Sequence, residues 1–497
     1  MSLETVNFRA GTLALVKEDE QGEPKKPTSG NDFTAIQPDI SLSPGLETLE
    51  NEELKNSIMP GKSIVGRENP TISLSHYFRA GEAGQKPDYS LMLEAAFGTV
   101  SEVTVEPSIV SVTDKRTFEV DDATELKKGA TLLVQSTTGF EPRPINSVVG
   151  NVVTLEFDLN ELPNVGALCG KPITYEPIDD SNLIPTLTSW YYLPNVIEMI
   201  AGTRIEGVDI TFPAAELINA TFSGSGIGFY YNPLVIEATN KFLDVEVGGQ
   251  EYSASIPEGT YKDPEQVGEA VDNALNANGS GLIYSVEYQK DGKYKIIADG
   301  SFIMLGATGS NVANGLMPTI GFDAADTADA TEQESNNPID LSSGFSPQYD
   351  DSDPIAAKGN LLLIGDPEDN VCIHASSVDF ALANTKADLL DICAESGVGA
   401  TIFNERTATA SVASYLQPYE ARFFAKLRKG DKVAFYYCAG EKKGGQFIKE
   451  KCAAVYMSHA TINSLEISDQ DGAAKLDLEI AAYAPEDSTQ SAFLGFV

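Results

Sequence analysis

Histidine is scarce in this sequence of 497 residues, and tryptophan occurs once. The three histidines, His76, His374 and His459, lie in strand-like segments, and none has a second histidine nearby in the sequence. A catalytic triad or a metal site needs partners at a workable spacing, and no H-x-x-x-H or G-x-S-x-G motif supplies one. We therefore expect structural histidines, no catalytic residue, no metal site, no cofactor and no enzymatic activity.

Paired cysteines and long apolar runs are also missing. The five cysteines are odd in number and show no C-x-x-C spacing, which indicates reduced thiols in a protein that folds in a cytoplasm. No apolar run is long enough to span a bilayer, and the first residues lack the basic and apolar regions of a signal peptide. These features predict a protein that does not associate with a membrane.

Basic residues are few, because 34 Lys and Arg stand against 73 Asp and Glu, and the formal net charge is −39. Such a surface repels nucleic acid phosphates, so specific recognition of DNA or RNA is not expected. Solubility alone can account for a high net charge. A sharper hypothesis is a channel wall of like sign, along which DNA slides without binding.

What the sequence does contain is a pattern that occurs twice. Residues 39–78 and 378–416 each run through a strand, an acidic polar loop, a turn with Arg, Glu and Asn, and an alternating strand that ends near a tyrosine. The later matching segments are helices at 87–94 and 419–427, double-tyrosine strands at 190–192 and 435–437, and closing strands at 207–229 and 460–483. Chance similarity between two β-rich stretches is the alternative. A duplicated β-rich unit without a catalytic signature favours an assembly subunit that packs equivalent faces around a ring.

The pattern divides the chain into a discontinuous first domain, two inserted modules, a linker and a second domain. The first insertion has its own hairpin signals, and the second has a helix that begins at Asp263 and Pro264. An acidic segment without Lys or Arg follows, which is typical of a linker. The expected ranges are 1–103 with 173–235 for the first domain, 104–172 for a small β module, 236–330 for an α+β module, 331–354 for an acidic linker and 355–497 for the second domain.

The order of strand, long loop, strand, helix and closing strands is carried by residues 60–78, 87–98 and 190–229 and by their counterparts 398–416, 419–430 and 435–483. This order resembles the tail tube domain of long-tailed bacteriophages. The resemblance implies a mainly β fold with α+β elements, in which two tandem β-sandwich domains each carry a helix. It also implies that inner sheets join around a lumen and that rings stack into a tube. We expect the two inserted modules to project outward.

For a chain with two fused domains, the resemblance implies the major tail tube protein of a siphovirus, a structural protein of the virion tail that is made in the bacterial cytoplasm. It would self-assemble as a homotrimeric, pseudo-hexameric ring around a negatively charged lumen through which DNA passes during ejection. Expected partners are further copies of the chain, the tape measure protein, the tail terminator, and genomic DNA in transit without specific binding. The acidic loop 44–62 is long enough to reach an adjacent ring, and its candidate ring-stacking residues are Glu47, Glu50, Glu52, Glu53 and Lys55. The sequence leaves the lumen-facing residues unassigned.

Two other functions fit parts of the sequence. A phage tail-tip or surface adhesin would bind carbohydrate through the inserted modules, with Tyr252, Tyr261, Tyr284 and Tyr288 as exposed aromatic candidates. A β-rich hydrolase would need a pair of carboxylates with perturbed pKa values, and the abundance of Asp and Glu makes any chosen pair uninformative.

Overall fold

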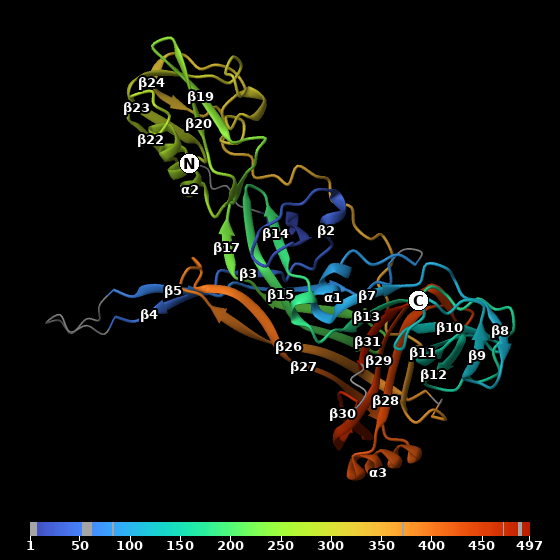
Figure 1. The fold of residues 1–497 in the computed structure, drawn as a ribbon. Coiled ribbons are helices and arrows are strands. Elements are labelled where there is room, and N and C mark those ends of the chain that lie inside the picture. The colour runs from blue at the N-terminus through green and yellow to red at the C-terminus, as the bar shows by residue number, and fades with distance from the viewer. Residues whose placement is uncertain (1–6, 52–61, 82–83, 370–371, 471, 486–489) are drawn as a thin grey trace.

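In the computed structural model the chain forms a mainly β structure, with a central body and two smaller modules (Figure 1). The structure describes residues 7–51, 62–81, 84–369, 372–470, 472–485 and 490–497. The prediction of a mainly β fold is confirmed, since strands in several sheets dominate the described residues. The helices of the described residues are α1 (Ser90–Phe97), α2 (Pro264–Asn276) and α3 (Arg422–Lys429), with short 3-10 turns at Phe8–Ala10, Gly30–Asp32, Ser181–Leu183, Val312–Asn314 and Pro418–Ala421.

The body is built from antiparallel strands around a main core that both of its ends share, with two smaller buried clusters beside it. Its strands are β1 (Thr12–Lys17), β2 (Phe33–Thr34), β3 (Ser41–Ser43), β6 (Thr71–Tyr77), β7 (Gly98–Glu102), β13 (Ile173–Pro177), β14 (Leu187–Leu193), β15 (Val196–Pro213), β16 (Asn219–Ser225), β17 (Gly228–Tyr231), β25 (Leu361–Gly365), β26 (Ala375–Leu390), β27 (Val398–Tyr415), β28 (Val433–Lys443), β29 (Gln446–Gln470), β30 (Ala473–Ala482) and β31 (Ala492–Phe496). Apolar residues alternate with polar ones along many of these strands, so one side of each strand can be buried. Val208, Phe222 and Phe380 belong to the same buried cluster, which therefore joins residues from both ends of the chain.

The same six strand pairings occur twice in the body. In the first unit, defined as β1, β3, β6, α1 and β14–β17, the pairings are β1–β14, β14–β15, β15–β16, β16–β6, β6–β3 and β15–β17. In the second unit, defined as β25–β31 and α3, they are β25–β28, β28–β29, β29–β30, β30–β27, β27–β26 and β29–β31. All of these pairings are antiparallel. In the first unit α1 follows β6, and in the second unit α3 follows β27.

Irregularities in the ladders also fall at matching places. The β14–β15 register shifts between Leu187 and Ser189, and the β28–β29 register shifts between Val433 and Phe435. By this correspondence Trp190 matches Tyr436. The match of 190–192 with 435–437 in the sequence is therefore off by one residue, because similar letters align there while hydrogen bonding across the ladder fixes the register.

One continuous antiparallel sheet runs through both units in the order β3–β6–β16–β15–β26–β27–β30–β29. The units meet where β15 pairs with β26, with Gly207 opposite Ala383 and Pro213 opposite Ser377. The chain thus contains one complete junction between two units that have the same pairings.

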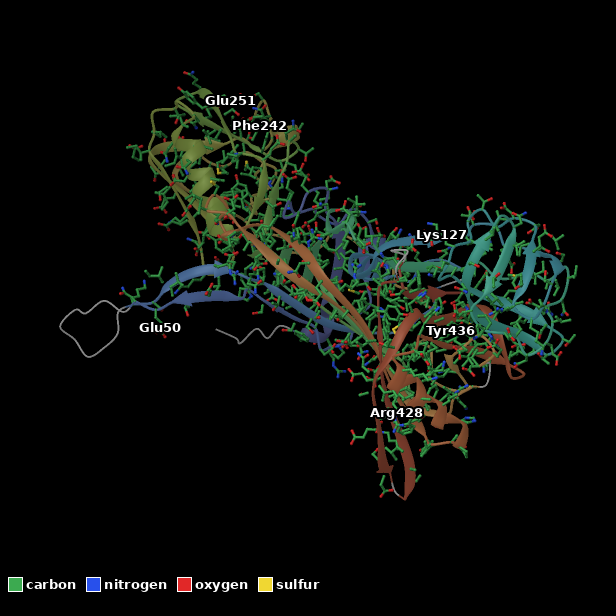
Figure 2. All side chains as sticks on the ribbon, turned by 60° about the horizontal axis from the view of Figure 1, so that its bottom comes forward. Glu50, Lys127, Phe242, Glu251, Arg428 and Tyr436 are labelled. Atoms are coloured by element: carbon green, nitrogen blue, oxygen red, sulfur yellow. The ribbon has the colours of Figure 1, made fainter. Side chains whose placement is uncertain are left out.

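Module 1, residues 104–172, packs against the second unit. Its strands are β8 (Ile109–Val112), β9 (Thr117–Val120), β10 (Thr131–Ser136), β11 (Gly139–Val149) and β12 (Val152–Leu155). Leu133 and Phe157 share a buried cluster with Tyr436 and Tyr456 of the second unit, and the Tyr456 hydroxyl donates a hydrogen bond to Glu156 at 2.7 Å. Figure 2 shows Tyr436 beside this module. The apolar side of module 1 covers the face of the second unit's sheet that is turned away from the shared core, and the outward projection of the inserted modules stays a prediction.

Module 2 stands away from the body and has its own core (Figure 1). Its strands are β18 (Leu234–Ile236), β19 (Phe242–Val247), β20 (Gln250–Ser255), β21 (Gly259–Tyr261), β22 (Tyr284–Tyr288), β23 (Tyr294–Met304) and β24 (Ala330–Glu334). The predicted helix start is confirmed, since the Asp263 side chain accepts a hydrogen bond from the Gln266 N–H at 2.9 Å.

The predicted linker 331–354 is wrong in its first part, where β24 pairs with β23 and Ile339 packs into the core of module 2. Lys295 lies 2.7 Å from Glu332, and Lys293 lies 3.8 Å from Glu334. Two of the acids that made this segment resemble a linker therefore have cationic partners, one on β23 and one directly before it.

Candidate assembly surface

One face of the continuous sheet is covered by the core, and the opposite face carries small polar side chains. Val208, Phe380 and Val412 are buried, and side chains at alternating positions point the other way. One row on this polar face, in the order β6, β16, β15, β26, β27, β30, β29, is Ser75, Thr221, Asp209, Ala381, Thr409, Ala481 and Thr461, and the next is Tyr77, Asn219, Thr211, Asp379, Ser411, Glu479 and Ser464.

Carboxylates are spread across this polar face. Asp209 and Asp379 lie near the junction of the two units, and Glu466, Asp477 and Glu479 lie on β29 and β30. Burial raises the pKa of Asp209 above its ordinary value. The described face also carries Lys475, which lies 3.0 Å from Asp477, so its balance of charge is negative.

The continuous sheet ends in two strand edges. β3 pairs with β6 on one side, and residues 464–470 of β29 pair with β30 on one side. Within the described part of the chain, neither stretch has a partner strand on its other side. Unpaired N–H and C=O groups along a strand form a template for pairing with another chain. Ile467 lies on the free stretch of β29, and its side chain is 50% exposed.

These two edges match the two strands that pair inside the chain. Ser41 lies opposite Ser73 as Asp379 lies opposite Ser411, so β3 matches β26. The register of β15 with β16 shifts between Ile205 and Gly207, and that of β29 with β30 shifts between Ile462 and Ser464, so β29 matches β15. Since β15 and β26 pair with each other, their junction defines how the edge of β29 can meet the edge of β3 on a second copy.

β4 (Leu46–Leu49) and β5 (Ile64–Glu68) form a hairpin, in which the candidate ring-stacking residue Glu47 lies on β4 and the candidate Glu50 directly follows this strand. This hairpin projects from the body (Figure 1). Glu47 Oε2 lies 3.7 Å from Arg67 Nε, and Glu50 is exposed (Figure 2). Glu52, Glu53 and Lys55 lie outside the described residues, so the structure brings only part of the predicted set together.

His76 is buried in the body beside Asp88. Its side chain is 2% exposed, and its Nε2 lies 3.3 Å from Asp88 Oδ1. Burial raises the pKa of Asp88, but the hydrogen bond and charge of His76, with the N–H groups of Ala35 and Asp350, outweigh it and hold this pKa below its ordinary value. In the described ranges no group of three or more His, Cys, Asp and Glu is arranged to hold a metal ion. The described helices include none that is both long and apolar enough to cross a membrane.

The aromatic candidates for carbohydrate binding do not form an exposed platform. Tyr284 is buried and packs edge-on against Phe302, so its predicted exposure is wrong. Tyr252, Tyr261 and Tyr288 are only partly exposed, and each packs against the core of module 2. Their rings serve the module's packing because the apolar residues of a small module must cover its few strands.

The sequence did not identify the two edges or the acids of the polar face. The signal available was the run from Ser464 to Ser468, where polar and apolar residues alternate near the far end of a long strand. Alternation predicts a strand, but it does not tell which edge of that strand lacks a partner.

No protein-family model matches the sequence, and no curated protein matches it. Weak likenesses to solved structures include the SPP1 tail tube, with 12% identity over 27% of this chain and 75% of that chain and a TM-score of 0.20. The virion of a native gene transfer agent gives 16% identity over 26% of this chain and 94% of that chain, with a TM-score of 0.20. The Hcp protein gives 12% identity over 25% of this chain and 78% of that chain, with a TM-score of 0.16. These TM-scores are too low to decide either fold or function.

Proposed function

We propose that the chain is a structural subunit of a bacteriophage tail tube, in which three copies form a ring of six like units and the rings stack around a lumen. In this proposal the chain belongs to the tail of a siphovirus, is made in the bacterial cytoplasm, and lets DNA pass without binding it specifically. Its partners are further copies of itself, the tape measure protein and the tail terminator.

The observation that carries the proposal is the β15–β26 pairing together with two free edges that match those strands. Each copy offers one edge of each kind, so copies add head to tail. A head-to-tail contact generates a closed ring when its rotation closes. Joining the edge of β29 to the edge of β3 of the next copy then extends the eight-stranded order of one chain around the ring.

The polar face supports a lumen lined by this sheet. Met92 and Leu93 of α1 and Phe423 of α3 belong to the core on the opposite side of the sheet, and in this proposal the helices therefore occupy the outer layer of the tube. The inner layer would then present Ser and Thr hydroxyls with Asp209, Asp379 and their neighbours. A wall with the same sign of charge as DNA does not displace counterions from the DNA phosphates. The wall therefore gains no affinity that would hold the passing DNA.

A cysteine pair at the proposed edge contact tests this arrangement. By the register of β15 and β26, Glu466 on β29 lies opposite Ser43 of the next copy, as Asp209 lies opposite Ala381. Opposed residues in antiparallel strands are about 4.5–5.5 Å apart at Cα, within the range of a disulfide. We expect Ser43→Cys with Glu466→Cys, in a Cys393→Ser background, to give covalent trimers on mild oxidation. Non-reducing gel electrophoresis and a mass determination of the covalent product would measure them.

The chain offers matched controls for this pair. Asp209→Cys with Ala381→Cys should close a disulfide within one chain and give no covalent oligomer on the non-reducing gel. Ser43→Cys with Ile467→Cys places the two side chains on opposite faces of the sheet and should stay reduced. Monomers from the Ser43–Glu466 pair at concentrations where the parent forms rings would contradict the proposal.

Stacking of rings through the acidic loop is a separate part of the proposal. Deleting 47–55, which removes Glu47, Glu50, Glu52, Glu53 and Lys55, should prevent the formation of long tubes because the contact to the next ring is lost. Negative-stain electron microscopy would then show single rings or monomers. Tubes of normal length from this variant would refute the role of the loop in stacking.

A further inference from the structure

The outer part of the β26–β27 hairpin, residues 384–390 and 398–406, packs against the first unit. The Asn384 side chain donates hydrogen bonds to the carbonyl oxygens of Ala96 and Ile205, at 2.9 and 3.3 Å. Phe403 lies under the guanidinium of Arg204, with Cζ 5.4 Å from the ring centroid. The Arg204 Nε also donates to Thr401 Oγ1 at 3.1 Å, and Thr401 is buried. This hairpin therefore strengthens the junction of the two units beyond the strand pairing.

The β4–β5 hairpin is the counterpart of this outer part. Thr48 lies opposite Val65 as Lys386 lies opposite Phe403, and Leu49 lies opposite Ile64 as Ala387 lies opposite Ile402. A register shift separates Leu46 from Thr48 in one hairpin and Thr385 from Lys386 in the other. The two hairpins thus share their pairing up to and beyond the bulge.

Residues that are exposed on the β4–β5 hairpin match residues that are buried or packed on the β26–β27 hairpin. Leu46 matches Asn384 and is 50% exposed, whereas Asn384 is 5% exposed. Val65 matches Phe403 and is 63% exposed. Apolar side chains with this exposure on a projecting hairpin indicate a surface that another chain covers.

The surface of the first unit that the β26–β27 hairpin contacts has a counterpart on the second unit. Arg204 pairs with Ser225 as Thr461 pairs with Ala481, so Thr461 matches Arg204. α1 and α3 each have eight residues and end at a glycine with positive φ, Gly98 and Gly430, so Arg428 matches Ala96. Figure 2 shows Arg428 well separated from the hairpin that carries Glu50, so the two surfaces are available to different copies.

We propose that the β4–β5 hairpin is a lateral clamp, which lies across the second unit of the next copy in the same ring. The inference rests on the proposed ring. Val65 packs beside Thr461, and Leu46 packs at the C-terminal end of α3 near Arg428. Leu46–Leu49 and Ile64–Glu68 then act within a ring, so the deletion of 47–55, which removes part of β4, is expected to weaken the contact within the ring as well as the stacking.

Two neighbouring residues of β5 provide the test. Val65 faces the proposed partner, while Ile64, which is 60% exposed, points to the other side of the hairpin. Both substitutions place the same carboxylate on an equally exposed position, so the free chain should tolerate both. In the Ser43→Cys, Glu466→Cys background, we expect Val65→Asp to reduce the yield of covalent trimer about tenfold or more, and Ile64→Asp to leave it unchanged.

A second readout reports proximity. Val65→Cys with Thr461→Cys should be joined between chains by a short bismaleimide, and Ile64→Cys with Thr461→Cys should not. Equal trimer yields from the two aspartate variants, with no cross-link from Val65 to Thr461, would overturn the clamp while the edge pairing stands. Absence of covalent trimer from the Ser43→Cys, Glu466→Cys protein that keeps Ile64 and Val65 would instead overturn the ring itself.

Discussion

Ile467→Asp is expected to abolish ring formation while the free chain keeps its stability. In the proposed edge pairing Ile467 lies opposite Leu42 of the next copy, as Ile210 lies opposite Phe380 within the chain. The substitution removes the burial of an apolar side chain and places a carboxylate in the contact. These two effects together cost about 3 kcal/mol or more per junction, which corresponds to roughly a hundredfold weaker association.

Sedimentation velocity over a range of concentrations would measure this effect, and thermal unfolding would check the free chain. Because Ile467 is 50% exposed in the single chain, its melting temperature should change little. Leu162→Asp is the matched control, since Leu162 is 53% exposed on module 1 and has no place in the junction. Normal assembly of Ile467→Asp, or equal loss in both variants, would count against the edge pairing.

Removal of module 1 is expected to destabilise the second unit severely. Glu102 on β7 lies opposite Ile173 on β13, so a two-residue turn can replace 103–172 without moving either strand. The deletion would expose Leu363, Tyr436, Tyr456 and Phe493, which are buried against the module. Each such side chain contributes about 1.5–3 kcal/mol, and their sum is comparable to the whole stability of a typical domain, about 5–15 kcal/mol.

Denaturant unfolding and binding of an apolar dye would follow this change. Replacing 237–340 of module 2 by a Gly-Ser linker is the control, because its core is its own and Val235 and Leu341, which pack near Trp190, stay in place. Module 2 also contacts the β4–β5 hairpin through Lys262, whose Nζ lies 3.4 Å from Glu68. We expect a much smaller loss from this deletion. A soluble module 1 deletion that unfolds like the parent chain would show that the buried cluster does not support the second unit.

Local features of this protein could be predicted from the sequence because they depend on neighbouring residues. Alternation at Thr71–Tyr77 predicted a strand, and the Asp263-Pro264 pair predicted the start of α2. The similarity of 39–78 to 378–416 was also visible, since the strands that end at Tyr77 and Tyr415 occupy matching positions in the two ladders. The strong negative charge follows from composition alone.

Other features were decided only when distant segments met. The partner of β15 is β26, the partner of β23 is β24, and the cover of Tyr436 is module 1, and none of these choices is encoded by nearby residues. A strand pattern has a period of two and specifies faces, whereas hydrogen bonding between segments far apart in the chain specifies register and leaves an edge paired or free. For that reason the sequence by itself determined the β-rich character and the charge, and the tertiary structure decided which acids share the polar face and which edges remain open.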